Sequence, residues 1–251
     1  MDRIFAVGGA GAIAAMAFGT ESIPRVDKIV GPGNAYVAEA KLQLTSQVAI
    51  DSPAGPSELL IIVDDSAEAD LVAREVLAQA EHDARACVIV VAIGEDVAAR
   101  VETQIAAAAL SAARSEIIVE SLETRGGVVS VANIAEAVEA ANEFAPEHLM
   151  IATADPAAIL GQIRNAGTVF VGATSSVSFG DYMTGANHVL PTGGLARSYS
   201  GLSTVDFFRW TTCQSVSPEA AVRLARDTAV FAESEGLSAH AAAARAWEIS
   251  R

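Results

Sequence analysis

The chain has four histidines, and each lies in a short cluster of polar residues within a sequence that is 51% hydrophobic. A single histidine is more often a packed, half-buried side chain than a ligand or a base. Several clusters of imidazole, carboxylate and amide groups together favour a functional site. The clusters are Gln79-Ala80-Glu81-His82, Pro146-Glu147-His148, Gly180-Asp181-Tyr182 continuing to Asn187-His188, and Leu237-Ser238-Ala239-His240.

The first cluster has the spacing of metal ligands. Gln79 and His82 are three residues apart on a predicted helix, so both side chains project from one face of it. With Asp181 and His240 they make a nitrogen and oxygen shell that suits zinc or, less specifically, manganese or cobalt. Taken alone, Gln79 and His82 are more typical of a polar helix end, where the helix dipole favours a histidine.

The second cluster has the composition of an acid–base pair. Glu147 and His148 directly follow Pro146, which pins the backbone where a predicted helix ends. An imidazole can accept a proton from an alcohol near neutral pH, and an adjacent carboxylate can activate water. A capping glutamate beside a packed histidine explains the same two residues about as well.

Glycine-rich turns offer a further, less specific signal. The turn Gly31-Pro32-Gly33-Asn34 follows a predicted strand and precedes a predicted helix, where free backbone N–H groups can bind a phosphate. Neither this turn nor Gly8-Gly9-Ala10-Gly11 has the GxGxxG spacing, and tight turns explain the glycines equally well. Ser57 could present a hydroxyl just ahead of a strand, although a plain turn is the simpler explanation.

Composition limits the possible partners. The 251 residues carry a formal charge of −15, which argues against nucleic acid and leaves no polybasic patch for a membrane surface. Cys87 and Cys213 lie far apart, so neither a disulfide framework nor a cysteine zinc site is indicated, and we expect a cytoplasmic protein. The apolar segment 4–18 is too short and interrupted to span a bilayer and is interpreted as core.

Short apolar runs alternate with alanine-rich stretches of helical period, which predicts an α/β fold with a parallel sheet. The expected strands are Val26–Val30, Glu58–Val63, Cys87–Ala92, Val128–Val131, Leu149–Ala152 and Thr168–Val171. The expected helices are Ala35–Thr45, Asp70–Glu81, Glu95–Ala112, Asn133–Phe144, Pro156–Arg164, Pro218–Glu235 and Ser238–Ser250. The stretch Ala173–Tyr199 has little periodicity and is expected to be a long functional loop.

The expected topology places two of the clusters at one edge of the sheet. A crossover helix runs antiparallel to its strands, so its C-terminal end lies near the start of the next strand. Both His82 and His148 are therefore expected at the N-terminal edge, although ligands usually bind beyond the carboxyl ends of strands. The loop 173–199 leaves the opposite edge but is long enough to fold back and bring Asp181 and His188 to the other two.

The sequence resembles the histidinol dehydrogenase family through an ordered series of segments that covers nearly the whole chain. The segments are VDKIVGPGN, AIDSPAGPSE, the Gln79–His82 cluster, PEHL, GDYMTGANHVLPT and the terminal SAH. The resemblance implies an enzyme of histidine biosynthesis that uses zinc and NAD to oxidise L-histidinol through L-histidinal to L-histidine. It also implies a homodimer whose active site is shared between the subunits.

The resemblance assigns a role to each residue that matches a family position. The implied zinc ligands are Gln79, His82, Asp181 and His240. His148 is the implied base that accepts the hydroxyl proton, and Glu147 the implied residue that activates water for the aldehyde step. The implied substrate contacts are Ser57 and Glu235 together with the zinc ligands and His148.

The cofactor and domain expectations follow from the same resemblance. Asn34 matches a family contact to NAD, whereas Gly11 stands where the family has a glutamine that contacts NAD, and His188 lies at the edge of the site without a definite role. Family members are much longer, so the resemblance implies that part of the N-terminal region is missing and that activity of this chain alone is in question. The implied fold is an incomplete Rossmann-like parallel sheet with flanking helices and a C-terminal helical arm. Its expected parts are a nucleotide-binding remnant at 1–56, an incomplete catalytic α/β domain at 57–203 and a dimerisation arm at 204–251.

Two other functions stay open on the sequence. A related zinc and NAD dehydrogenase could act on another small alcohol, but the Glu235 carboxylate suits a cationic amino alcohol better than an anionic one. A truncated, non-catalytic zinc-binding dimerisation fragment would also carry these motifs.

Overall fold

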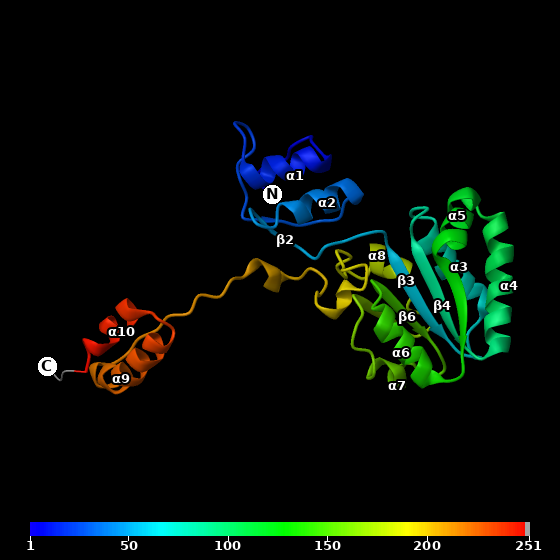
Figure 1. Cartoon of the computed structure of the whole chain (residues 1–251). Helices are drawn as coiled ribbons and strands as arrows, with labels where there is room; N and C mark the ends of the chain where they lie inside the picture. The colour runs from blue at the N-terminus through cyan, green and yellow to red at the C-terminus, as the bar shows by residue number, and fades with distance from the viewer. Residues whose placement is uncertain (249–251) are drawn as a thin grey trace. The chain divides into compact units, whose positions relative to one another are not determined.

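A computed structural model describes residues 1–248 of the chain and divides them into two compact units (Figure 1). The first unit ends at Phe207 and the second begins at Phe208. The first contains both parallel sheets, and the second is a helical hairpin. Each unit is considered by itself below.

A five-stranded parallel sheet forms the centre of the first unit. Its strands are β3 (Glu58–Val63), β4 (Cys87–Ile93), β5 (Gly126–Val131), β6 (His148–Ala152) and β7 (Thr168–Val171), in the order β5-β4-β3-β6-β7. Neighbouring β3 and β6 both read as continuous apolar runs because helices cover both faces of a parallel sheet. The chain order reverses between these two strands, as in half of a Rossmann fold.

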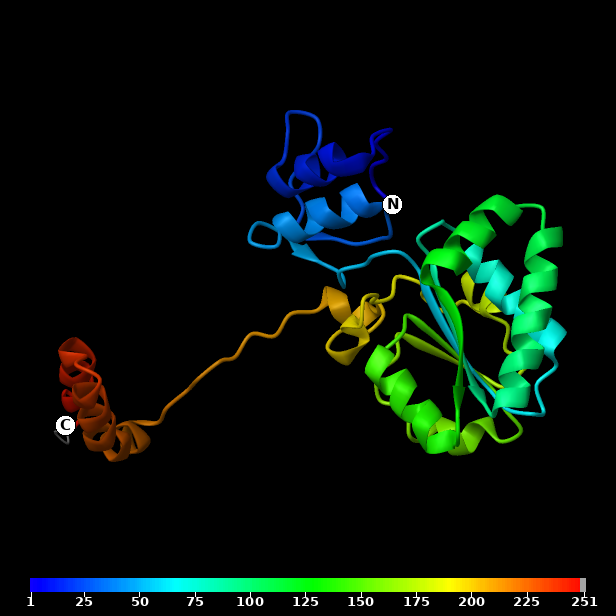
Figure 2. The same ribbon diagram turned by 45° about the vertical axis from the view of Figure 1, so that its right-hand side comes forward.

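Helices pack on both faces of this sheet (Figure 2). Helices α3 (Ala69–Ala80), α4 (Glu95–Ser111) and α5 (Ser115–Arg125) bury their apolar stripes in one core, which includes Val76, Val101 and Ile118. Helix α6 (Ile134–Phe144) and the short α7 (Pro156–Leu160) contribute Val138 and Ile159 to the core on the other face. The predicted α/β class with a parallel sheet flanked by helices is therefore confirmed.

The first fifty residues form a small element of their own within the first unit. Helix α1 (Gly9–Phe18), strand β1 (Lys28–Ile29), helix α2 (Ala35–Gln43) and strand β2 (Ala49–Ile50) enclose a core that includes Ile13 and Ile29. The buried Lys41 ammonium pairs with the buried Asp51 carboxylate, whose other oxygen accepts a hydrogen bond from the Gly31 N–H at 2.7 Å. Lys41 also donates to the Gly31 carbonyl at 3.0 Å, so this ion pair fixes the glycine turn that follows β1.

The second unit pairs helix α9 (Pro218–Ser234) with helix α10 (Ser238–Arg245). The Ser217 hydroxyl caps α9, and Gly236, at φ 76°, makes the turn between the helices. The contact between the helices buries mainly alanines, while the larger Phe231 and Trp247 side chains stay exposed. The hairpin considered by itself therefore has a small core and exposed apolar side chains.

Several elements differ from the sequence-based expectation. Segment 4–18, interpreted as core, contains the helix α1, and the expected strand Val26–Val30 is reduced to two residues. Helix α5 and strand β2 were not expected, because α5 has a polar composition and β2 is only two residues long. The expected loop 173–199 contains helix α8 (Val177–Tyr182) and the 3₁₀ turn Leu195–Arg197, which tertiary contacts hold in place. The end of the expected helix Ser238–Ser250 lies partly outside the described residues.

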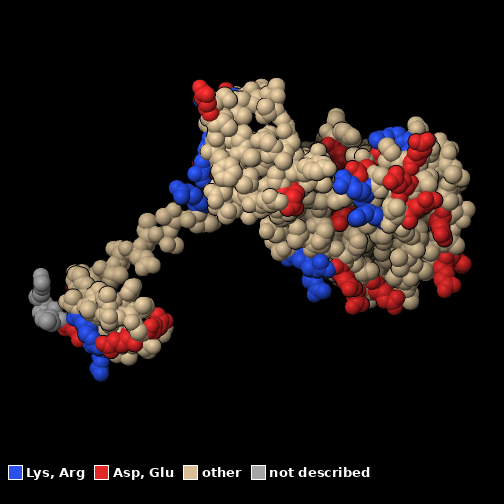
Figure 3. Space-filling view, turned by 45° about the horizontal axis from the view of Figure 1, so that its top comes forward, with Lys and Arg blue, Asp and Glu red and all other residues tan. Residues whose placement is uncertain are grey.

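Most charged side chains lie on the surface, and Figure 3 shows acidic groups interspersed with fewer basic ones on one face of the molecule. Among residues 1–248, no helix is both long and apolar enough to cross a lipid bilayer.

We expect the Lys41–Asp51 pair to be the charged contact on which the small N-terminal element depends. Lys41→Met keeps most of the apolar stem but leaves a buried, unpaired carboxylate, and we expect a loss of about 3–5 kcal/mol in the free energy of unfolding of that element. The matched control is Arg74→Met, because Arg74 and Asp70 form an exposed pair worth at most about 1 kcal/mol. Urea unfolding measures both, and equal losses in the two variants would contradict the assignment.

Candidate functional site

A cavity of about 250 Å³ lies at the edge where the central strands begin. Three of the histidines and both members of the expected acid–base pair line it, although they come from segments far apart in the sequence. The polar side chains in its lining are Asp51, Ser57, Gln79, His82, Glu147, His148, Asp181, Tyr182 and His188. The structure thus brings three of the sequence clusters together at the N-terminal edge of the sheet.

The pairing of β3 with β6 positions Glu147 and His148. His148 is the first residue of β6 and lies opposite Leu59 in the register, so the backbone of Glu58 comes next to both side chains. The Glu58 N–H donates to Glu147 Oε2 at 2.9 Å, and His148 Nδ1 lies 3.1 Å from the Glu58 carbonyl oxygen. The two backbone groups of one residue, Glu58, therefore hold the acid and the base.

These hydrogen bonds determine the protonation pattern of His148. A carbonyl oxygen can only accept, so the Nδ1 atom of His148 must carry the proton. In a neutral ring, the Nε2 atom is then left with a free lone pair. Burial lowers the pKa of His148 from its usual range, which favours this neutral form despite the nearby Asp181 carboxylate.

Burial shifts the pKa of Glu147 in the opposite direction from that of His148. Burial is the main cause that raises the pKa of Glu147 to about 8, and the negative charges of Glu58 and Asp181 raise it further. Hydrogen bonds from the Glu58 N–H and from the Ser57 hydroxyl act against this rise. The Glu147 carboxyl is thus largely protonated at pH 7 and becomes a base as the pH passes about 8.

The C-terminal end of helix α3 positions Gln79, and the residues just after the helix position His82. Its buried positions Val72, Ala73 and Val76 face the sheet, and Gln79, only 3% exposed, follows on the same side at the C-terminal end. His82 lies just beyond the helix and is exposed. Neither side chain forms a hydrogen bond with another residue of the described chain, so their donor atoms are available to the cavity.

Helix α8 brings Asp181 to the same cavity. Its first residue, Val177, is buried in the core beneath α3, and the Val177 N–H donates to the Glu75 carboxylate of α3 at 3.0 Å. A β-carbon at Gly180 would lie 2.6 Å from the Phe170 ring, so glycine allows α8 to approach β7 closely. The Phe170 ring in turn lies 5.9 Å, centre to centre, from that of His148.

Three residues of the first unit that line the cavity carry donor atoms of the types that bind zinc. Gln79, His82 and Asp181 offer an amide oxygen, an imidazole nitrogen and a carboxylate, a donor set that fits zinc. Zinc sites generally have four ligands, and within residues 1–248 no group of three or more His, Cys, Asp or Glu side chains is placed to hold a metal ion. His240 and Glu235 lie on the second unit, where both are exposed.

The glycine turn at 31–33 lines the same cavity. The Asn34 side-chain oxygen caps α2 by accepting from the N–H groups of Tyr36 and Val37, at 3.1 and 3.2 Å. The Gly31 N–H is bonded to Asp51. These hydrogen bonds fix the turn, and its use as a phosphate site stays a prediction. Gly11 lies exposed on α1.

Sequence reasoning missed Glu58 and Thr192 at this site. Glu58 was interpreted only as the first residue of a strand, because a backbone contact leaves no mark in residue type. Thr192 is 3% exposed, and its hydroxyl accepts a hydrogen bond from the Gly55 N–H, which ties the loop after His188 to the start of β3. In the sequence, the one available signal was a threonine in the polar stretch that follows His188.

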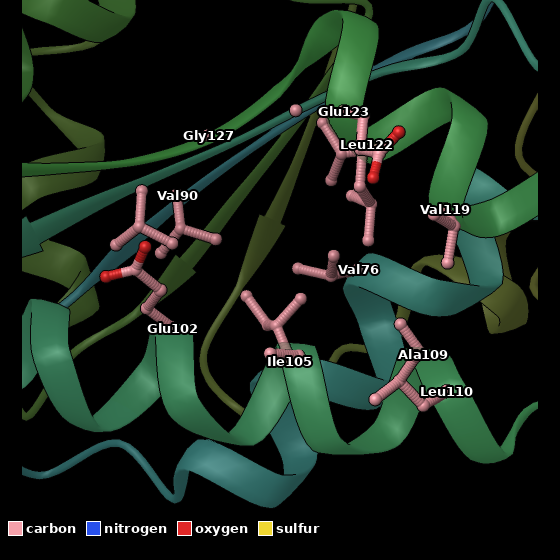
Figure 4. Close-up of a pocket in the computed structure, with 14 residues that line it drawn as sticks. Val76, Val90, Glu102, Ile105, Ala109, Leu110, Val119, Leu122, Glu123 and Gly127 are labelled. Carbon is pink, nitrogen blue, oxygen red and sulfur yellow. The ribbon is translucent and has the colours of Figure 1, made fainter.

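A second cavity, of about 440 Å³, lies where α4 and α5 pack on β4 and β5. Figure 4 shows mostly apolar side chains around it, such as Val76, Val90 and Ile105. Of the described residues that line it, only Glu102 and Glu123 are charged. Because its lining within residues 1–248 is otherwise apolar or glycine and contains no histidine, cysteine, serine or amide side chain, this cavity is not the candidate site.

Comparisons with known proteins agree with the geometry. A family model described as histidinol dehydrogenase matches residues 1–247. The histidinol dehydrogenases of Methanosarcina mazei and Methanothermobacter thermautotrophicus are 46% and 50% identical, over 98% and 96% of this chain and 56% of each relative. The crystal structure of histidinol dehydrogenase from Elizabethkingia anophelis aligns with a TM-score of 0.86 at 40% identity, over 96% of this chain and 56% of that one. The chain thus spans little more than half the length of these relatives, and it belongs to the histidinol dehydrogenase family.

Proposed function

We propose that this chain carries the zinc and acid–base residues of an enzyme that oxidises L-histidinol through L-histidinal to L-histidine in the cytoplasm. The observation that carries the proposal is the His148 imidazole, held neutral with Nε2 free, beside Glu147 in a cavity that also receives Gln79, His82 and Asp181. The family relationship supplies the substrate, and the cavity supplies the chemistry.

The first step requires a base that can accept the hydroxyl proton of the alcohol. His148 Nε2 is suited to this task, because Nδ1 is bonded to the Glu58 carbonyl and burial keeps the ring uncharged. The hydroxyl proton moves to Nε2 as the carbon loses a hydride to the electron acceptor. Glu58 holds the ring in this orientation through its carbonyl oxygen.

The second step requires water to add to the aldehyde. Glu147 in its ionised form accepts a proton from that water, and a second hydride loss then gives the carboxylic acid. Ser57, which donates to Glu147, also lines the cavity and is a candidate contact for the substrate. The raised pKa of Glu147 makes this step favour alkaline pH.

We propose zinc as the resident metal, with Gln79, His82 and Asp181 as ligands from one subunit. A bound zinc ion would hold the substrate's amine and imidazole nitrogens and so orient the alcohol toward His148. We propose NAD as the electron acceptor on the family relationship alone. Asn34 is the candidate contact to it, because its side-chain oxygen caps α2 while no hydrogen bond from its side-chain NH₂ group occurs within residues 1–248.

We further propose a homodimer in which the helical hairpin completes the partner's cavity with His240 as a zinc ligand and Glu235 as a substrate contact. Two observations support this arrangement. The zinc shell of the first unit lacks a donor, and the hairpin exposes Phe231 and Trp247 around a core of alanines. A carboxylate at Glu235 suits the cationic amine of an amino alcohol.

Removal of one ligand tests the metal site. We expect His82→Ala to weaken zinc binding by more than the roughly 10- to 100-fold that changes outside the ligand shell cause. The control is His188→Ala, which removes an imidazole from the same cavity without removing a proposed ligand. Metal analysis after dialysis measures zinc per chain, and unchanged zinc in His82→Ala would exclude this ligand set.

The raised pKa of Glu147 predicts how stability depends on pH. The folded state binds the carboxyl proton more tightly than the unfolded state, so this stabilising effect is complete below about pH 4.5 and is lost as the pH rises through about 8. Glu147→Gln removes this loss while keeping an oxygen that can accept from the Glu58 N–H. We therefore expect the variant to be more stable than the wild type at pH 9, by on the order of a few kcal/mol, and nearly equal at pH 4.5.

Urea unfolding at the two pH values measures this difference. The control is Glu143→Gln, an exposed carboxylate near the end of the preceding helix. A Glu147→Gln variant whose gain is the same at both pH values would contradict the pKa assignment.

A further inference from the structure

Glu58 links three separate parts of the candidate site. Its N–H and carbonyl groups bond Glu147 and His148, as described above. Its side chain points elsewhere, because Oε1 accepts a hydrogen bond from the Gly193 N–H at 2.9 Å. A single residue thus contacts the acid, the base and a loop that lies 135 residues further along the chain.

The loop that Glu58 holds carries one wall of the cavity. His188, Val189 and Leu190 line the cavity, and the next residues turn back over the start of β3. Gly193 and Gly194, at φ 64° and 74°, adopt left-handed backbone that favours glycine and directs the Gly193 N–H to Glu58. Thr192 makes the second attachment, through its hydroxyl and the Gly55 N–H.

The remaining oxygen of Glu58 distinguishes this residue from an ordinary loop support. Oε2 is buried and has no hydrogen-bond partner within the described residues. Burial also raises the pKa of the Glu58 carboxyl, so this residue is held at a cost to folding. The bond to Gly193 needs only an oxygen at this reach, which a glutamine of the same length also offers.

We propose that Glu58 is a positioning residue that fixes His188 and the 188–194 loop relative to the Glu147–His148 pair. Its backbone orients the pair, and its carboxylate, through Gly193, sets the position of the opposite cavity wall. This assignment rests on the proposed function for the significance of the pair. The loop attachment itself can be tested without any turnover.

Amide hydrogen exchange and histidine NMR signals of the full chain test the assignment. We expect Glu58→Ala to increase the exchange rate of the Gly193 N–H by about tenfold or more and to shift the ring signals of His188. Glu58→Gln keeps an oxygen at the same reach, so it should restore both signals to near their wild-type values. The control Glu143→Ala removes an exposed carboxylate near the same loop and should change neither.

Glu58→Asp gives a second measurement if the alanine variant does not fold. It keeps the charge but is one methylene shorter, so it should lose the Gly193 contact and shift His188 as alanine does. A His188 ring signal that stays in place when the Gly193 N–H loses its protection would overturn the proposal. Failure of Glu58→Gln to restore the Gly193 protection and the His188 signal would also overturn it. Unchanged zinc content in His82→Ala together with these shifts would contradict the proposed metal site and leave the positioning role intact.

Discussion

The site depends on the parallel pairing of β3 with β6. This register sets His148 opposite Leu59. The backbone C=O of Glu58 then meets the His148 imidazole, and the backbone N–H of Glu58 meets the Glu147 carboxyl group. Because both strands are buried on both faces, a slip in register would move each side chain into the opposite core and disrupt the packing of both, so it is strongly disfavoured. Core packing thus fixes the strand register, and the backbone of Glu58 in turn fixes the positions of Glu147 and His148.

The position of the cavity at the starts of the strands has an electrostatic reason. The carboxyl ends of parallel strands meet helix N-termini, whose partial positive charge suits phosphates. The opposite edge meets helix C-termini, whose partial negative charge suits cations. Gln79 and His82 lie at the C-terminal end of α3, so a metal ion and a cationic amino alcohol both match the field there. The unusual edge is therefore consistent with the chemistry that we propose for it.

Much of the fold and several site residues could be predicted from the sequence. Buried strands such as Glu58–Val63 and amphipathic helices such as α3 have strong periodicity, and crossover topology placed His82 and His148 at one edge. Helix α8 could not be predicted, since its six residues form only because Val177 and Gly180 pack on α3 and β7. The role of Glu58 was hidden for a related reason, because it acts through backbone groups and a contact to a distant glycine. The bond from the Gly31 N–H to Asp51 could not be predicted either, because it joins residues 20 positions apart.

The central claim is that the Glu58 carbonyl holds His148 as a neutral base with Nε2 free. Long-range ¹H–¹⁵N NMR of the histidine rings tests this directly, because it reports which ring nitrogen carries the proton. At pH 7 we predict the pattern of an Nδ1–H tautomer for His148, and titration should show a pKa below the usual value near 6.5. A His148 ring that is protonated on Nε2, or charged at pH 7, would contradict the account.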